Sequence, residues 1–141
     1  MLTFSAAALA AALACILLHY EALRLLAGWT LRMSRAPRQR LVAVMVGALF
    51  SHIVQIVFFA CVLWMTVALA APAALADVAT PTTWRALYLS IESYAALGSP
   101  DTFHFGALRL FCGIESLLGL LMIGWTSAFT YWAMRKFWRF H

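Results

Sequence analysis

The sequence predicts an all-α integral membrane protein, with three transmembrane helices and a shorter helix that re-enters the membrane without crossing it. Hydrophobic residues make up 65% of the 141 residues and charged residues 11%, a composition unlike that of soluble domains. A spanning helix needs about 20 mostly apolar residues, and three segments meet that need: 2–26, 41–71 and 105–133. The remaining segment, 82–97, is too short to cross a hydrocarbon core of about 30 Å.

Basic residues orient these segments, because short loops rich in Lys and Arg stay in the cytoplasm. Arginines end or follow the first span, at Arg24, Arg32, Arg35, Arg38 and Arg40, and basic residues follow the last, at Arg135, Lys136 and Arg139. Charges on the other side nearly balance: Asp77, Arg85, Glu92, Asp101 and Arg109. We expect the N terminus outside and the C terminus in the cytoplasm. No cleaved signal peptide is expected, since the first 18 residues carry no charged side chain.

Other classes of protein are disfavoured. The net charge of +5 comes from residues that flank spans, and these do not form a separate nucleic-acid-binding domain. Cys15, Cys61 and Cys112 lie inside the spans without paired spacing, which indicates buried thiols rather than a metal site. No pattern of nucleophile and base, metal ligands or phosphate loop indicates an enzyme. Neither an enzymatic activity nor a cofactor is predicted.

The short helix has its own boundary signals. Thr80 and Pro81 form an N-cap and first-turn pair, and Gly98 can end the helix by taking a positive φ. Three residues at helical spacing give it one apolar and aromatic face: Trp84, Tyr88 and Ile91. If its C-terminal carbonyls pointed to the membrane centre, they would attract a cation. A capped hairpin at the membrane surface, without a conductive function, is the alternative.

The stretch from Tyr88 to Asp101 reads YLSIESYAALGSPD, a short helix that runs into a glycine-centred loop. It resembles the pore loop of potassium channels, whose usual text is Thr-Thr-Val/Leu-Gly-Tyr-Gly-Asp. The resemblance implies a filter-like loop formed by Ala95, Ala96, Leu97, Gly98, Ser99, Pro100 and Asp101.

This loop departs from the usual filter. Ala96 removes a ring of threonine hydroxyls, and Ser99 removes the aromatic residue that packs behind the loop. Pro100 holds φ near about −65°, where the usual glycine can take a positive φ. We therefore expect potassium selectivity to be weak or absent, with monovalent cations as the candidate permeant ions.

The stretch from Arg109 to Phe129, RLFCGIESLLGLLMIGWTSAF, is similar to the inner helix of small three-span bacterial ion-channel proteins. His52 and the aromatic residues after it are similar to the second span of that group. The resemblance implies a homotetramer around a central pore in the bacterial inner membrane. Residues 1–40 would then form the first span and a cytoplasmic loop, and residues 41–141 a pore module. This module comprises an outer helix at 41–71, a pore helix and loop at 81–101, and an inner helix at 105–134.

Glu92 lies nine residues before Asp101, the spacing at which some potassium channels place a carboxyl pair behind the filter. Such a pair would share one proton and brace the loop. Pairing of Glu92 with Arg85, two helical turns earlier, or a carboxylate at the outer surface are the open alternatives.

Ionisable residues inside a membrane are costly and are candidate functional groups. His19 and His52 lie at similar depth, about 18 Å from the cytoplasmic edge, so they could face each other. Glu115 lies about 12 Å further out, too far for a direct proton relay. We expect these three residues to be satisfied structural groups, and Glu21 to pair with Arg24.

Gly119, together with Gly113 and Ser116, allows close approach of helices. It also resembles the inner-helix hinge glycine of gated channels. Two function classes remain open: an oligomeric ion-conducting pore, or a non-conducting accessory subunit that reuses the pore fold beside other membrane subunits.

Overall fold

The described residues of the computed structural model, 2–70, 83–97 and 106–138, form helices without a strand. The four helices are α1 (Leu2–Arg32), α2 (Pro37–Ala70), α3 (Thr83–Tyr94) and α4 (Gly106–Phe137). The predicted all-helical class is therefore confirmed.

Three helices are long and apolar enough to cross a membrane: α1, α2 and α4. Their 31, 34 and 32 residues correspond to about 46 to 51 Å, well beyond a hydrocarbon core of about 30 Å. The chain is a multi-pass membrane protein. Helices α1 and α4 extend past the C-terminal ends of the predicted spans at 2–26 and 105–133, because each helix continues into its basic flank. Helix α2 likewise begins before residue 41, at Pro37, since proline suits the first turn of a helix.

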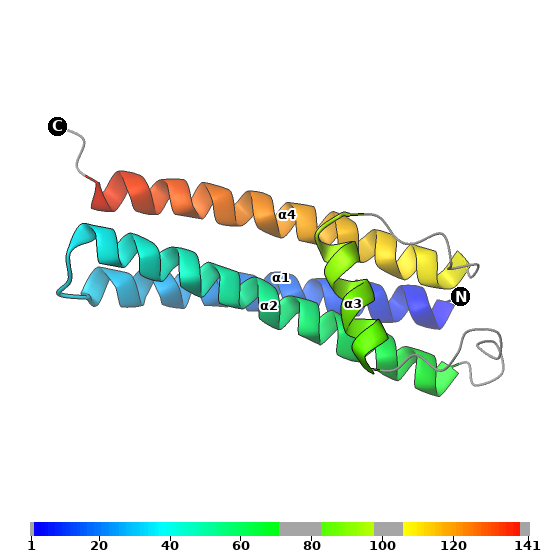
Figure 1. Cartoon of the computed structure of the whole chain (residues 1–141). Coiled ribbons are helices and arrows are strands. Elements are labelled where there is room, and N and C mark those ends of the chain that lie inside the picture. The colour runs from blue at the N-terminus through cyan, green and yellow to red at the C-terminus, as the bar shows by residue number, and fades with distance from the viewer. Residues whose placement is uncertain (1, 71–82, 98–105, 139–141) are drawn as a thin grey trace.

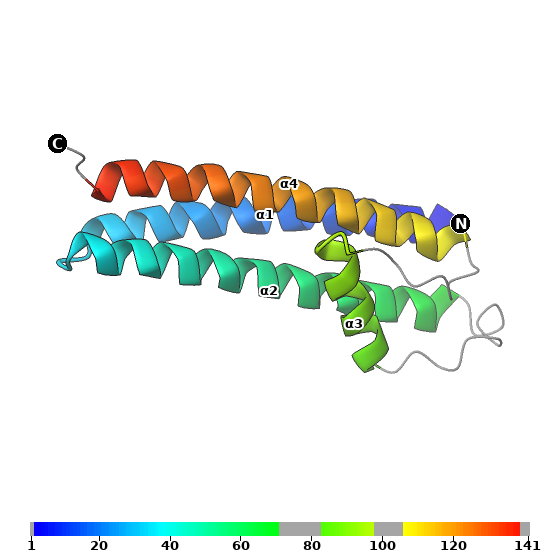
Figure 2. The same cartoon turned by 45° about the horizontal axis from the view of Figure 1, so that its top comes forward.

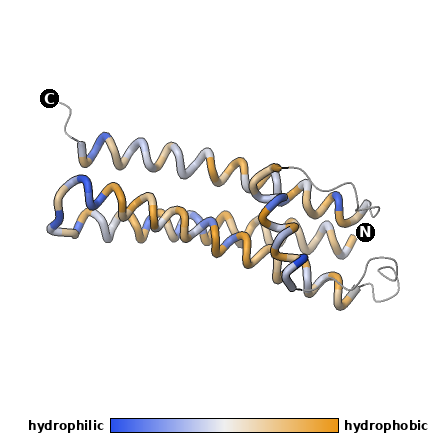
Figure 3. The backbone as a smooth tube through the Cα atoms, in the orientation of Figure 1, coloured by the Kyte–Doolittle hydropathy of each residue, from blue (hydrophilic) through white to orange (hydrophobic). Residues whose placement is uncertain are grey.

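The three long helices lie side by side with alternating direction (Figure 1). The start of α1, the end of α2 and the start of α4 share one end of the bundle, and the end of α4 lies at the other. Hydrophilic residues concentrate near the turn between α1 and α2 (Figure 3). There the Nε atom of Arg40 donates to the Arg35 carbonyl oxygen at 3.0 Å, and the Arg40 guanidinium lies 5.7 Å from the centre of the Phe137 ring.

Helix α3 differs from the other three in length and direction. It has only 12 residues, lies across the long helices and packs against α2 and α4 (Figures 1 and 2). At about 18 Å it is too short to cross the hydrocarbon core. The structure thus contains the short helix expected between the second and third spans.

The interior of the bundle has two apolar regions with a polar layer between them. The larger region joins all four helices and includes Cys15, Phe59, Leu89 and Phe111. The smaller one lies near the basic end and consists of Leu41, Val44, Ala133 and Phe137. Buried polar side chains occupy the levels in between: His19 on α1, Ser51 and Gln55 on α2.

The C-terminal end of α3 differs from the prediction. The helix ends at Tyr94, and among the described non-glycine residues the one with a positive φ is Ala96, at 54°, two positions before the expected Gly98. The backbone N–H of Leu97 donates to the Glu92 carbonyl and that of Ala96 to the Ser93 carbonyl, each at 3.0 Å. These two bonds form a Schellman motif, which places its left-handed residue at position 96. The expected cap at Thr80 and Pro81 lies outside the described residues.

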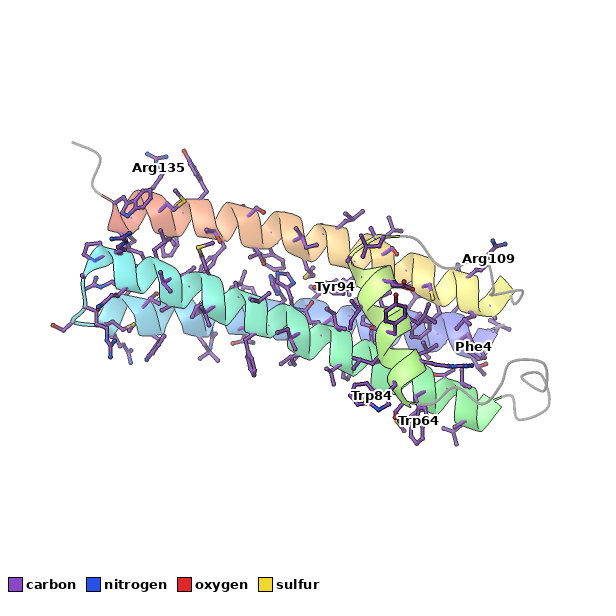
Figure 4. All side chains as sticks on the ribbon, viewed as in Figure 1. Phe4, Trp64, Trp84, Tyr94, Arg109 and Arg135 are labelled. Atoms are coloured by element: carbon purple, nitrogen blue, oxygen red, sulfur yellow. The ribbon has the colours of Figure 1, made fainter. Side chains whose placement is uncertain are left out.

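The predicted apolar face of α3 turns away from the bundle. Trp84, Tyr88 and Ile91 are exposed, whereas the buried residues are Ala86, Leu89, Ser90, Ser93 and Tyr94. Trp84 projects from the start of α3 on the same side as Trp64 of α2 (Figure 4). In a membrane the apolar face can contact lipid, while small and polar residues make the helix contacts.

Candidate functional site

Five side chains from all four helices form a closed ring of hydrogen bonds, called here the polar ring. The Gln55 amide nitrogen lies 2.9 Å from His19 Nδ1, and His19 Nε2 lies 3.2 Å from Thr126 Oγ1. Thr126 Oγ1 in turn lies 2.9 Å from His52 Nε2, and His52 Nδ1 lies 2.8 Å from the Tyr94 hydroxyl. The Tyr94 hydroxyl closes the ring by donating to Gln55 Oε1 at 3.0 Å.

The direction of every bond in the polar ring follows from counting hydrogens. Tyr94 donates its single hydroxyl hydrogen to Gln55, so its oxygen accepts a hydrogen bond from the Nδ1–H of His52. A neutral His52 then accepts at Nε2 from Thr126, which leaves Thr126 to accept from the Nε2–H of His19. His19 finally accepts at Nδ1 from the Gln55 amide.

The ring is therefore complete when both histidines are neutral, with the hydrogen on Nε2 of His19 and on Nδ1 of His52. Ser51 supports it, because its hydroxyl accepts the Gln55 amide at 3.2 Å and lies 3.3 Å from His19 Nδ1. The two imidazole centres are 5.2 Å apart. The ring is not a continuous proton wire, since the amide of Gln55 does not gain or lose protons near neutral pH.

A second polar contact joins α3, α4 and α2 nearer the start of α4. The hydroxyl of Ser90 is hydrogen-bonded to Glu115 Oε1 and lies 2.9 Å from the carbonyl oxygen of Ile56. Ser90 and Glu115 are fully buried. Ser116, the residue after Glu115 on α4, donates its hydroxyl hydrogen to the Ser93 carbonyl oxygen at 2.7 Å. The inward face of α3 is thus held by polar bonds as well as by apolar packing.

Three ionisable residues were expected to be satisfied structural groups: His19, His52 and Glu115. His19 and His52 lie together, as their equal depth suggested, and each imidazole has partners at both nitrogens. Glu115 and His52 do not bond directly. Each contacts α3, through Ser90 and Tyr94 respectively, and these two residues lie one turn apart. The expected pair of Glu21 and Arg24 is confirmed at 3.1 Å.

The filter-like loop is described only in its first part. Ala95, Ala96 and Leu97 are exposed, and Gly98, Ser99, Pro100 and Asp101 lie outside the described residues. The proposed brace between Glu92 and Asp101 therefore stays a prediction. The Tyr88 hydroxyl bonds to Glu92, which raises the pKa of Tyr88, and the Oε2 atom of Glu92 is buried without a hydrogen-bond partner.

Several residues of the site were not predicted from the sequence: Gln55, Ser90, Tyr94 and Thr126. The best available signal was on α2, where Ser51, His52 and Gln55 place three polar residues on adjacent turns of an otherwise apolar span. Among the described residues, no group of three or more His, Cys, Asp or Glu side chains could hold a metal ion.

No protein family, curated protein or solved structure matches this chain.

Proposed function

We propose that the chain is a subunit of a channel-like pore, a homotetramer in the bacterial inner membrane with its N terminus outside. The observation that carries this proposal is the position of α3. It lies across α2 and α4. The end of α2 and the start of α4 share one end of the bundle. The C-terminal turn of α3 contacts α4 at Gly119, near the middle of that helix. A re-entrant pore helix must be too short to cross the membrane, and its C-terminal end must reach toward the middle of the spanning helices.

The outward face of α4 is the proposed pore wall. It is exposed and apolar, and it includes Gly113, Leu117, Leu120, Gly124, Ala128 and Tyr131. These residues recur at helical spacing opposite the buried Glu115 and Met122. An apolar wall of this kind can gate a pore by excluding water.

The proposed permeant ions are monovalent cations, without strong preference for potassium. The resemblance to a potassium filter supports the ion class, and the residues at Ser99 and Pro100 argue against potassium selectivity. The C-terminal end of α3 adds a favourable electrostatic contribution, since the negative end of a helix dipole attracts cations.

A non-conducting accessory subunit is the second candidate. The polar ring favours it, because its five side chains satisfy one another inside a single chain and leave no polar face for an ion. Under this alternative, the exposed faces of the helices would contact other membrane subunits.

Cysteine modification during cation flux into liposomes separates the two candidates. In a Cys61→Ala background, which removes the exposed native thiol, Leu117→Cys places a thiol on the proposed pore wall. Leu49→Cys, equally apolar and exposed at 60%, is the matched control on α2. A charged, thiol-reactive reagent is expected to reduce flux through the Leu117→Cys protein and not through the Leu49→Cys protein. Absence of flux in a folded, reconstituted protein would favour the accessory subunit.

A further inference from the structure

The contact between Ser90 and Glu115 constrains where hydrogens can lie. A serine hydroxyl has one hydrogen and can donate once. The Ser90 hydroxyl has two oxygen neighbours, the Ile56 carbonyl and Glu115 Oε1. The Ile56 carbonyl can only accept, so the Ser90 hydrogen belongs to that contact. The contact with Glu115 then needs a hydrogen of its own, and the carboxyl group is its only source.

We propose that Glu115 is a proton-binding site, neutral at pH 7, whose acid hydrogen bonds to Ser90. Two hydrogen bonds then run in one direction, from Glu115 on α4 to Ser90 on α3 and from Ser90 to the Ile56 carbonyl on α2. Such chains strengthen each other in a low-dielectric interior. This proposal concerns the bundle itself and does not depend on ion conduction.

The surroundings of Glu115 agree with a neutral acid. Its side chain is fully buried, and Oε2 has no hydrogen-bond partner. An ionised carboxylate there would be a buried charge with an unsatisfied acceptor, which is costly. Among the described residues, the titratable groups that interact with it are Cys15 from α1, Tyr94 from α3 and Cys112 from its own helix. All three are neutral near pH 7, and α2 contributes only the Ile56 carbonyl to the contact.

Loss of the proton would change the attachment of α3. An ionised Glu115 has no hydrogen to give, so the Ser90 hydroxyl would turn its hydrogen to the carboxylate. The contact between Ser90 and Ile56 would then be two oxygens facing each other without a hydrogen. Deprotonation of Glu115 is therefore coupled to loss of one bond between α3 and α2.

Infrared spectroscopy of the full chain in lipid nanodiscs at pH 7 tests the proposal. The wild-type protein is expected to show the carbonyl absorption of a buried carboxylic acid, shifted by deuterium exchange. This band should lose intensity in Glu115→Gln and stay unchanged in Glu21→Gln, the control on α1 whose carboxylate pairs with Arg24. Ser90→Ala should retain the band at a higher frequency, because the acid loses its acceptor.

Three results would overturn the proposal. One is an acid band that is unchanged in Glu115→Gln. Another is a carboxylate band at pH 7 that disappears in that variant. The third is an acid band that appears only when sodium and potassium are replaced by choline, which would make Glu115 a cation ligand. If Glu115→Gln fails to fold, the Ser90→Ala spectrum still decides, since a band at the wild-type frequency contradicts the proposed bond.

Discussion

Gly119 of α4 lies directly against the backbone carbonyl of Tyr94, the last residue of α3. A Cβ atom at position 119 would overlap the Tyr94 carbonyl oxygen and lie 2.9 Å from its carbonyl carbon. The end of α3 can therefore reach the middle of α4 only where α4 has no side chain. This contact also brings the Tyr94 hydroxyl to the polar ring, since the same residue closes it.

Gly119→Ala is expected to displace the end of α3 and to destabilise the protein by about 1–3 kcal/mol, the usual range for overpacking. Gly124→Ala is the control, because nothing lies within 4 Å of a Cβ at that position. There the better helix propensity of alanine should leave stability unchanged or slightly increased. Thermal unfolding in detergent measures both variants. Equal stability of the two alanine variants would contradict the close contact.

Tyr94→Phe keeps the aromatic ring and removes the hydroxyl that bonds both Gln55 and His52. The buried Gln55 and the partly buried His52 each lose a partner, so a loss of about 1–3 kcal/mol is expected. Tyr131→Phe is the control, since Tyr131 is exposed at 62%. Unfolding by denaturing detergent provides the comparison. A Tyr94→Phe protein as stable as the Tyr131→Phe protein would show that the polar ring is not formed.

Ala96→Gly is expected to stabilise the protein by about 1 kcal/mol, because the φ of 54° disfavours a residue with a Cβ. Ala96→Thr should have the opposite effect, since a β-branched residue is strained there. Ala95→Gly is the control for added flexibility and should destabilise slightly, because Ala95 does not have a positive φ. The same unfolding assay ranks the three variants. A less stable Ala96→Gly protein would mean that Ala96 does not adopt this conformation.

Reconstituted protein is expected to show little discrimination between potassium and sodium. The expectation follows from Ser99 and Pro100, which cannot repeat the usual backbone and packing of a potassium filter. Reversal potentials in planar bilayers, measured with potassium on one side and sodium on the other, provide the check. A strong preference for potassium would show that the loop adopts a working filter despite Pro100.

The three spans could be predicted from the sequence because composition and length decide them. The shared depth of His19 and His52 could also be predicted, since the rise per residue of a helix is fixed. The partners of these histidines could not. Which residues meet across helices depends on the rotation of each helix about its own axis. A uniformly apolar span has no sequence pattern that indicates this rotation. Gln55 and Thr126 therefore emerged only from the packed structure.

The end of α3 shows why local signals can mislead. Gly98 is the residue that would end a helix most easily, yet the left-handed conformation falls on Ala96. Tertiary contacts explain the difference, because Tyr94 must reach Gly119 and the polar ring. Likewise, the spacing of Trp84 and Tyr88 predicted that these residues share one face of α3, but it did not predict whether that face points toward the bundle or away from it. In lipid, hydrophobicity alone does not turn a face inward.

The symmetry of purified particles in lipid nanodiscs, determined by electron cryomicroscopy, tests the proposed pore most directly. The channel proposal predicts four copies around one axis, with the C-terminal ends of the four α3 helices directed toward that axis and the outward faces of α4 lining it. A single copy bound to unrelated chains, or an assembly with α3 on its periphery, would contradict it.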